Sequence, residues 1–208
     1  MNKNRCPWCE THLDYQNYHD TEWGVPIYND AKLFETLLLE TFQAGLSWLT
    51  ILRKRENFRV AFDNFDVHKI AGYKGEKIDA LCQDQGIIRN SLKIKAAINN
   101  AQAFLKIQKS YRYFAKYMWS FVDHKPIQNS YHSLDEVPAK TALSDQISLS
   151  LKNHGFKFVG STIVYAHLQA IGMVNNHLVS CFRYKEVRNL GQKCQEFGSR
   201  NWLCTHTG

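Results

Sequence analysis

The sequence predicts an all-α fold, and three features of the chain support this prediction. Apolar residues recur every three or four positions through most of the 208 residues, which is the spacing of one helix face. No stretch of useful length alternates apolar and polar residues as a half-buried strand would. Glycine and proline fall between the helical patterns and not inside them. We therefore expect helices joined by loops.

The helical patterns cover residues 31–44, 48–57, 76–83, 92–108, 111–122, 144–153 and 161–171. Asp30 and Ser47 precede the first two patterns and can cap them, because short polar side chains accept hydrogen bonds from the first backbone N–H groups of a helix. Gly45 separates these two helices, and Pro126 and Pro138 bracket a loop before residue 144.

Composition and charge narrow the class of protein. A chain of 208 residues with 44% hydrophobic content can bury a full core in one domain, or at most two small ones. No apolar run approaches the length of a membrane span and the polar start resembles no secretion signal, so we expect a cytoplasmic protein. In a chain without a secretion signal, we expect the six cysteines to be free thiols or metal ligands and not a disulfide framework. A net charge of +7 makes a polyanionic partner such as nucleic acid plausible.

Two cysteine and histidine pairs lie near opposite ends of the chain. Cys6 and His19 form a Cys-x12-His pair, and His177 and Cys181 form a compact His-x3-Cys pair. Thiolate and imidazole are the ligands that tetrahedral zinc prefers, and four protein ligands leave no open position, so such a site is structural. Two alternatives stay open at this point: the four residues are ordinary buried thiols and polar histidines, or Cys9 is itself a ligand.

Aromatic residues are concentrated in the first quarter of the chain: Trp8, Tyr15, Tyr18, Trp23 and Trp48. Each of them could belong to the core. In a basic protein, clustered aromatic rings can also stack on nucleobases, with about 1–3 kcal/mol available per base.

Glu40 lies at the border of an apolar helix stripe that includes Leu33 and Leu37. Either an Arg or Lys at the rim pairs with this carboxylate, or the carboxylate stands at the mouth of a pocket and accepts hydrogen bonds from a polar or cationic ligand.

Two glycine-bounded segments could contact phosphate. Gly155 and Gly160 enclose a short hairpin that contains Lys157, and Ser161 begins the next helix. Free backbone N–H groups and the positive helix terminus favour an anion there, although such a turn can also be a simple connection. The turn that begins at residue 86 is followed by the basic residues Arg89 and Lys93. This segment either contacts phosphate or is a solvated helix end.

Taken in order, the motifs resemble one family, the bacterial DNA-3-methyladenine glycosylase I, a zinc-containing branch of the helix-hairpin-helix glycosylase superfamily. The resemblance extends from about Cys6 to Cys181. It rests on residues 18–26 (YHDTEWGVP), Glu40 with 43–48 (QAGLSW), 54–57 (KREN), 86–89 (GIIR), 119–122 (WSFV), 155–160 (GFKFVG) and 174–177 (VNNH).

The resemblance implies a base-excision repair enzyme that flips 3-methyladenine out of double-stranded alkylated DNA and removes it by hydrolysis. It implies a monomer with one structural zinc on Cys6, His19, His177 and Cys181, which leaves Cys9 outside the site. A non-catalytic module that binds DNA through the same hairpin is the alternative from another functional class.

The resemblance also implies site roles. Glu40 would be the catalytic residue that favours the cationic base, and Trp8, Tyr15, Tyr18 and Trp48 would form the substrate pocket. The residues expected to contact DNA are Leu46, Arg89, Lys93, Gly155, Lys157, Gly160 and Ser161. Many relatives in the wider superfamily carry a catalytic aspartate where this chain has Asn175, so we expect Asn175 to be structural. The glycosylase domain, with two helical lobes, is expected over residues 1–184, and residues 185–208 are left as a tail without assigned function.

Overall fold

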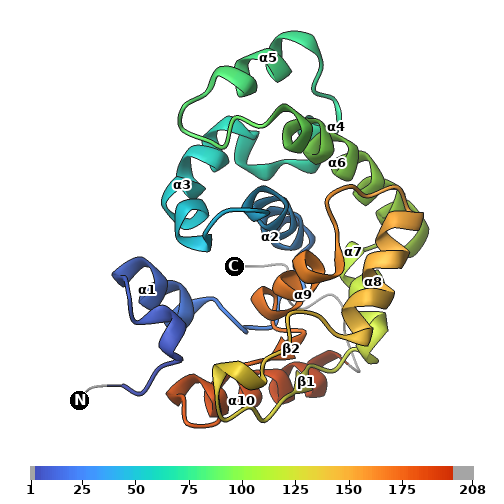
Figure 1. Ribbon diagram of the computed structural model, residues 1–208. Coiled ribbons are helices and arrows are strands. Elements are labelled where there is room, and N and C mark those ends of the chain that lie inside the picture. The colour runs from blue at the N-terminus through green and yellow to red at the C-terminus, as the bar shows by residue number, and fades with distance from the viewer. Residues whose placement is uncertain (1–2, 199–208) are drawn as a thin grey trace.

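The computed structural model describes residues 3–198, with side chains through residue 192, as a mainly helical protein (Figure 1). The α-helices are α1 (Leu13–Thr21), α2 (Asp30–Gln43), α3 (Trp48–Ala61), α4 (Val67–Ala71), α5 (Gly75–Gln83), α6 (Ser91–Tyr111), α7 (Phe114–Trp119), α8 (Ala142–Asn153), α9 (Ser161–Ala170) and α10 (Phe182–Gly198). Short 3-10 helices span Pro7–Cys9, Asp63–Phe65, Ser120–Val122 and Leu134–Glu136. The two-residue strands β1 (Ile127–Gln128) and β2 (Val174–Asn175) pair in parallel. Over residues 3–198 no helix is both long and apolar enough to cross a membrane.

Helix α2 lies at the centre of the molecule and packs against α3, α6, α7 and α9 (Figure 1). Its buried residues include Leu33, Leu37 and Phe42, which join a continuous core with Phe104 of α6 and Leu168 of α9. Helices α3 to α6 lie on one side of α2, and α1, α9, α10 and the two strands lie on the other. The site described below is formed where α2 meets this second group.

Capping residues were predicted for two helices, and one of the two predictions is corrected. Ser47 caps α3 as expected, since its hydroxyl accepts a hydrogen bond from the backbone N–H of Thr50 at 3.3 Å. Helix α2 is capped by Asn29 and not by Asp30. The Asp30 carboxylate instead accepts from the backbone N–H groups of Phe114 and Ala115, at 2.8 Å each, at the start of α7. Asp30 therefore ties α2 to a helix that is distant in sequence.

Three regions differ from the predicted helices. The helix expected over 111–122 is interrupted because Arg112 has a φ of 73°, and α7 begins only at Phe114. Helices α1 and α4 were not predicted, since α1 is largely polar and α4 has only five residues. The tail expected at 185–208 is helical as far as Gly198, because α10 runs across the expected domain boundary and buries Val187. The remaining residues of that tail lie outside the described part.

The hairpin between α8 and α9 is fixed by two neighbouring asparagines of α6. Asn99 donates to the carbonyl of Gly155 at 2.6 Å, and the Asn100 amide both accepts from and donates to the backbone of Lys157. Gly155 has a φ of +92°, which residues with a Cβ atom rarely adopt, whereas Gly160 has an ordinary φ of −62°. The hairpin is thus held from its inner side by α6.

Candidate functional site

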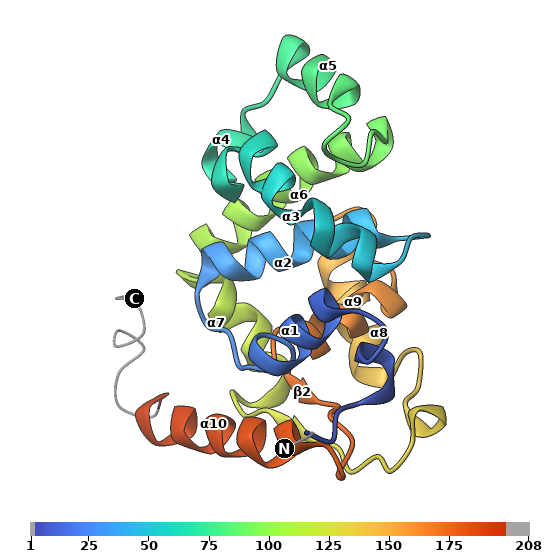
Figure 2. The same ribbon diagram turned by 90° about the vertical axis from the view of Figure 1, so that its left-hand side faces the viewer.

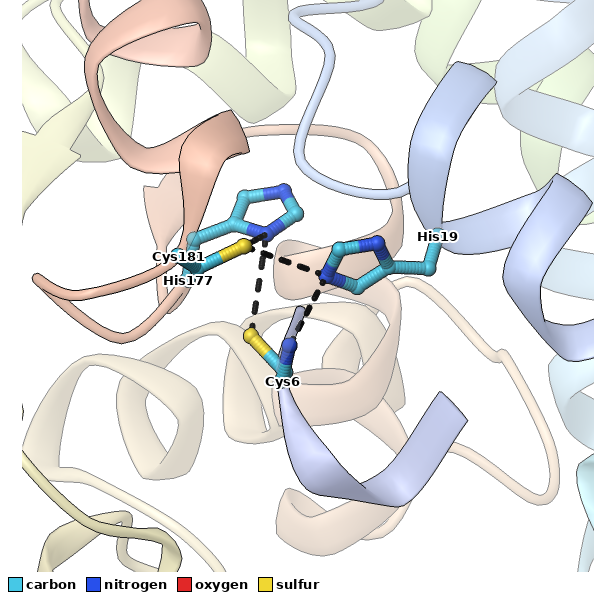
Figure 3. Close-up of side chains that lie close together, drawn as sticks. All are labelled: Cys6, His19, His177 and Cys181. Carbon is cyan, nitrogen blue, oxygen red and sulfur yellow. Dashed lines mark hydrogen bonds between the residues drawn. The ribbon is translucent and has the colours of Figure 1, made fainter. Parts of the chain in front are cut away.

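The segment before α1, α1 itself and the segment before α10 meet at a cluster of two thiols and two imidazoles (Figure 3). Cys6, His19, His177 and Cys181 are all buried, and each offers one ligand atom. These four atoms lie within 4.8 Å of one another. The sequence-predicted quartet is therefore assembled in space, with Cys6 before the first 3-10 helix, His19 on α1, and the other two before α10.

The hydrogen bonds around the cluster orient both imidazole rings toward its centre. Nδ1 of His19 bonds the Asp20 carboxylate at 2.8 Å, and Nε2 of His177 bonds the Trp23 carbonyl at 3.0 Å. Because an acceptor fixes the proton on each of these outer nitrogens, Nε2 of His19 and Nδ1 of His177 keep their lone pairs facing the sulfurs. They lie 3.5 and 3.7 Å from Sγ of Cys181.

This donor set fits a tetrahedral zinc ion, with two sulfurs, two inward imidazole nitrogens and a carboxylate or carbonyl behind each ring. A hydrogen bond with Cys6 and further bonds with both histidines hold the pKa of the Cys181 thiol below its ordinary value, whereas the same bond and burial raise the pKa of the Cys6 thiol. Cys9 lies outside the cluster, because its Sγ donates to the carbonyl of Cys6 at 3.1 Å.

A cavity of about 230 Å³ lies between α1, α2, α3 and α9, next to the cluster. One wall is aromatic, and α2 and α9 contribute polar side chains. The lining residues are Trp8, Tyr18, Trp23, Glu40, Gln43, Trp48, Ala166 and Gln169.

Glu40 is the acidic side chain of this cavity, and it is almost fully buried, with 3% of the residue exposed. Its Oε2 has no hydrogen-bond partner among residues 3–192, and no ion pair involving Glu40 occurs there. The alternative of a partner Arg or Lys at the rim is therefore wrong for the described part of the chain. Burial raises the pKa of the Glu40 carboxyl from 4.5 to about 8.

Trp48, on the neighbouring helix α3, also has a buried polar atom without a hydrogen-bond partner in the described chain, its indole Nε1. Two unpartnered polar groups that line one cavity are uncommon in a folded interior, where such groups are normally hydrogen-bonded. The cavity thus has the composition of a site for a planar, polar or cationic ligand.

The aromatic wall continues into the metal cluster. The ring of Trp23 packs edge to face against Trp8, with centroids 5.1 Å apart, and against His177, with centroids 4.6 Å apart. Trp8 follows Cys6 by two residues, and Tyr18 directly precedes His19 on α1. The contacts that stabilise the cluster therefore also position the aromatic wall of the cavity.

Two expected contact residues make hydrogen bonds within the fold. The Tyr15 hydroxyl accepts a hydrogen bond from the backbone N–H of Leu49 at 3.0 Å, and Tyr15 does not line the cavity. Lys93 is buried, with 6% of the residue exposed, and its ammonium donates to the carbonyls of Phe42 and Ala44 at the end of α2. Lys93 supports the end of α2, so its predicted contact with DNA is corrected. Tyr15 supports the start of α3, and its contact with substrate stays a prediction.

The other residues expected to contact DNA are accessible. Leu46, in the turn between α2 and α3, is 40% exposed. Arg89, Lys157 and Gly160 are also exposed, and Gly155 and Ser161 are partly exposed. Asn175 is fully buried and joins β2 to its surroundings through Gln128, Tyr184 and the backbone of His177, which confirms its expected structural role.

Sequence reasoning missed two amide side chains of the cavity, Gln43 and Gln169. Gln43 stands three residues after Glu40 on α2, so helical spacing already placed it on the same face. Gln169 gave no such signal, because nothing in its local sequence relates α9 to the aromatic segment.

Comparison with known proteins gives one consistent result. Residues 8–184 match the methyladenine glycosylase family. DNA-3-methyladenine glycosylase 1 of Escherichia coli (strain K12) is 48% identical over 180 residues, which covers 86% of this chain and 96% of that protein. A crystal structure of 3-methyladenine DNA glycosylase I superposes with a TM-score of 0.84 at 47% identity, and covers 86% of this chain and 98% of that one. A structure on 3-methyladenine recognition by the enzyme of Staphylococcus aureus gives 0.84 at 38% identity, with coverage of 88% and 97%.

Proposed function

The chain belongs to the methyladenine glycosylase family, and we propose that it is a base-excision repair enzyme that hydrolyses the N-glycosidic bond of 3-methyladenine in alkylated DNA. The observation that carries the proposal is the unpaired Glu40 carboxylate in a buried aromatic cavity. The substrate is double-stranded DNA, from which the lesion is flipped into the cavity before cleavage. The protein acts as a monomer in the cytoplasm, where this DNA lies.

Charge explains why this cavity favours the lesion. Methylation at N3 gives adenine a positive charge within DNA, and the base leaves as a neutral molecule. A cation beside Glu40 lowers the pKa of the carboxyl again, so the ionised carboxylate and the charged base stabilise each other. Ordinary adenine brings no such charge, and burial alone keeps the Glu40 proton in place near neutral pH.

Three aromatic residues complete recognition of the base. We assign stacking on the flipped ring to Trp8 and Trp48, with cation–π attraction of about 0.5–2 kcal/mol in favour of the charged lesion. Tyr18 is packed against Trp48 with ring centroids 5.5 Å apart, and its hydroxyl is the further hydrogen-bonding group we assign to the base.

Contact with the DNA backbone is assigned to the exposed residues of two segments. The backbone N–H groups of Gly155, Phe156 and Lys157 are bonded within the fold, so we assign the phosphate contact to the last residues of the hairpin 155–160 and to the start of α9 at Ser161, as expected for a helix-hairpin-helix unit formed by α8 and α9. Lys157 and Arg89 add positive charge, and we assign the exposed Leu46 to contact with DNA beside the flipped nucleotide.

We also propose that Cys6, His19, His177 and Cys181 hold one structural zinc ion. Zinc bound by four protein ligands has no open position for water, so it supplies folding energy and no step of the reaction. Its expected effect on catalysis is indirect, through the positions of Trp8, Tyr18 and Trp23.

The proposal is tested by incubating the protein with methylated duplex DNA and separating the released bases by chromatography. We expect free 3-methyladenine from the parent protein and a large loss of release from Glu40→Gln. A protein that binds the duplex but releases no base would instead be the non-catalytic DNA-binding module.

A further inference from the structure

We infer that Gln169 hydrogen-bonds the edge of the flipped base and is a specificity-determining residue of the cavity. Gln169 has this role only in a protein that binds the flipped base, so the role rests on the function proposed above. The reasoning begins with the polar groups that line the cavity: Glu40, Gln43, Trp48, Tyr18 and Gln169.

The side chain of Gln169 has no task within the fold. Its backbone carbonyl accepts hydrogen bonds from the N–H groups of Gly24 and Gly172, at 3.1 and 3.2 Å, which fixes the residue where the segment after Trp23 crosses α9. Its amide makes no hydrogen bond with any described residue, although the residue is partly buried and lines the cavity. A polar group held in this way is available to a ligand.

The position of Gln169 suits a base and not the DNA backbone. Gln169 lies eight residues after Ser161 on α9, about 12 Å along the helix from the terminus assigned to phosphate. Ala166 lines the same cavity one turn earlier, and its small side chain leaves space for a ring. Glu40 lies on α2, the helix that packs against α9 across this region (Figure 1). A base in the cavity therefore has Glu40 on one helix and Gln169 on the other.

Gln43 differs from Gln169 in its place on the cavity wall. It is the last residue of α2 and adjoins the turn that carries the exposed Leu46, so it stands at the side of the cavity toward DNA. The two amides of the cavity thus have different neighbours, and we assign contact with the base to Gln169.

The chemistry of an amide complements that of Glu40. An ionised carboxylate only accepts hydrogen bonds, whereas the Gln169 amide presents one acceptor and two donors in one plane. The edge of adenine offers an amino donor beside a ring nitrogen acceptor, which a glutamine can engage with two hydrogen bonds. Gln169 therefore supplies, in one group, the donor and acceptor that match a 6-amino purine.

The experiment measures binding of free 3-methyladenine and of 3-methylpurine, which lacks the 6-amino group, by calorimetry. We expect Gln169→Leu to bind 3-methyladenine about tenfold more weakly than the parent, with an unchanged melting temperature. Loss of the amino group should weaken binding to Gln169→Leu by a smaller factor than binding to the parent, because the partner of that group is already gone. If the Gln169 side chain were purely structural, removal of the 6-amino group would weaken binding to the variant and to the parent by the same factor.

Gln102→Leu on α6 is the matched control, since the Gln102 amide bonds the carbonyl of Ala71 and does not line the cavity. Should Gln169→Leu fail to fold, Gln169→Met keeps the side-chain length and supports the same comparison. Equal affinity of parent and variant for 3-methyladenine overturns the role of Gln169. So does an equal ratio, in parent and variant, of the affinity for 3-methyladenine to the affinity for 3-methylpurine. A parent protein that releases no base from methylated DNA overturns the proposed function instead, so the two failures are distinguishable.

Discussion

The metal cluster and the base cavity are both buried and polar, but their polar groups are used differently. In the cluster every ligand atom faces the other three within 4.8 Å, and each imidazole is held from behind by Asp20 or by the Trp23 carbonyl. In the cavity, Oε2 of Glu40 and Nε1 of Trp48 find no partner in the described chain. A site that binds a resident ion can satisfy its own groups, whereas a site that binds substrate must leave groups unsatisfied until the substrate arrives.

The two regions nevertheless share a wall. Trp23 contacts His177 on one side and Trp8 on the other, so the cluster positions side chains that the cavity needs (Figure 2 shows α1 beside the start of α10). We expect changes in the cluster to affect stability first and activity through stability. Changes in the cavity should affect activity while stability holds or improves.

The largest effect is expected from breaking the cluster. Cys181→Ser removes a thiolate ligand, so purified protein should contain much less than one zinc per chain and lose more than about 4 kcal/mol of unfolding free energy. Zinc analysis and chemical denaturation, with and without a chelator, measure both quantities. Cys9→Ser is the matched control, because Cys9 lies outside the cluster and its loss should leave zinc content unchanged. Full zinc occupancy in Cys181→Ser would remove the four-ligand assignment.

Glu40→Gln should increase the stability of the protein and lower its excision activity. The folded pKa of about 8 lies above the unfolded value of 4.5, so ionisation opposes folding progressively as the pH rises from 4.5 to 8. Glutamine does not ionise, and the variant should exceed the parent in stability by about 3 kcal/mol at pH 7 and by little at pH 4. Excision of 3-methyladenine should meanwhile fall by about a hundredfold, which corresponds to about 3 kcal/mol.

Denaturation at several pH values and base-release assays on the same preparations measure the two effects. A Glu40→Gln variant that loses stability but keeps the specific activity of the parent would show that the carboxylate is a structural group.

Trp48→Ala should reduce excision by about tenfold to a hundredfold, because loss of stacking removes about 1–3 kcal/mol of base affinity. Affinity for undamaged duplex should change little, since the residue lies inside the cavity.

Tyr15→Phe tests a residue beside the cavity, because it removes only the hydroxyl that accepts a hydrogen bond from the backbone N–H of Leu49. We expect it to cost about 1 kcal/mol of stability and to leave excision intact. A loss of excision in Tyr15→Phe as large as that in Trp48→Ala would return Tyr15 to the pocket.

The sequence allowed prediction of the parts of this structure that depend on local pattern or on matched motifs. The helical patterns, the Ser47 cap and the buried quartet of Cys6, His19, His177 and Cys181 were all predicted in advance. Glu40 was recognised because a carboxylate beside an apolar stripe needs a reason, and only the structure could show that no cation reaches it.

The failures have a common physical cause. Asp30 was assigned a cap from its near neighbours, and Tyr15 and Lys93 were assigned contacts from the resemblance, but the hydrogen-bond partners of all three lie 34 or more residues away in the chain. Polar side chains on helices can reach any element that packs against them, and sequence spacing does not reveal which element that is. The same limitation hid Gln169, whose importance depends on α9 facing the aromatic wall.

The smallest expected effects distinguish the two glycines of the hairpin. Gly155 has a φ of +92°, so Gly155→Ala should cost about 1 kcal/mol of stability. Gly160 has an ordinary φ and no atom within 4 Å of an added Cβ, so Gly160→Ala should leave the fold unchanged. Gly160→Asp places a negative charge where phosphate is expected, and it should weaken binding to damaged and undamaged duplex alike, by a few-fold that grows at low salt. Equal duplex affinity of Gly160→Asp and Gly160→Ala across a salt series would show that the hairpin lies off the DNA interface.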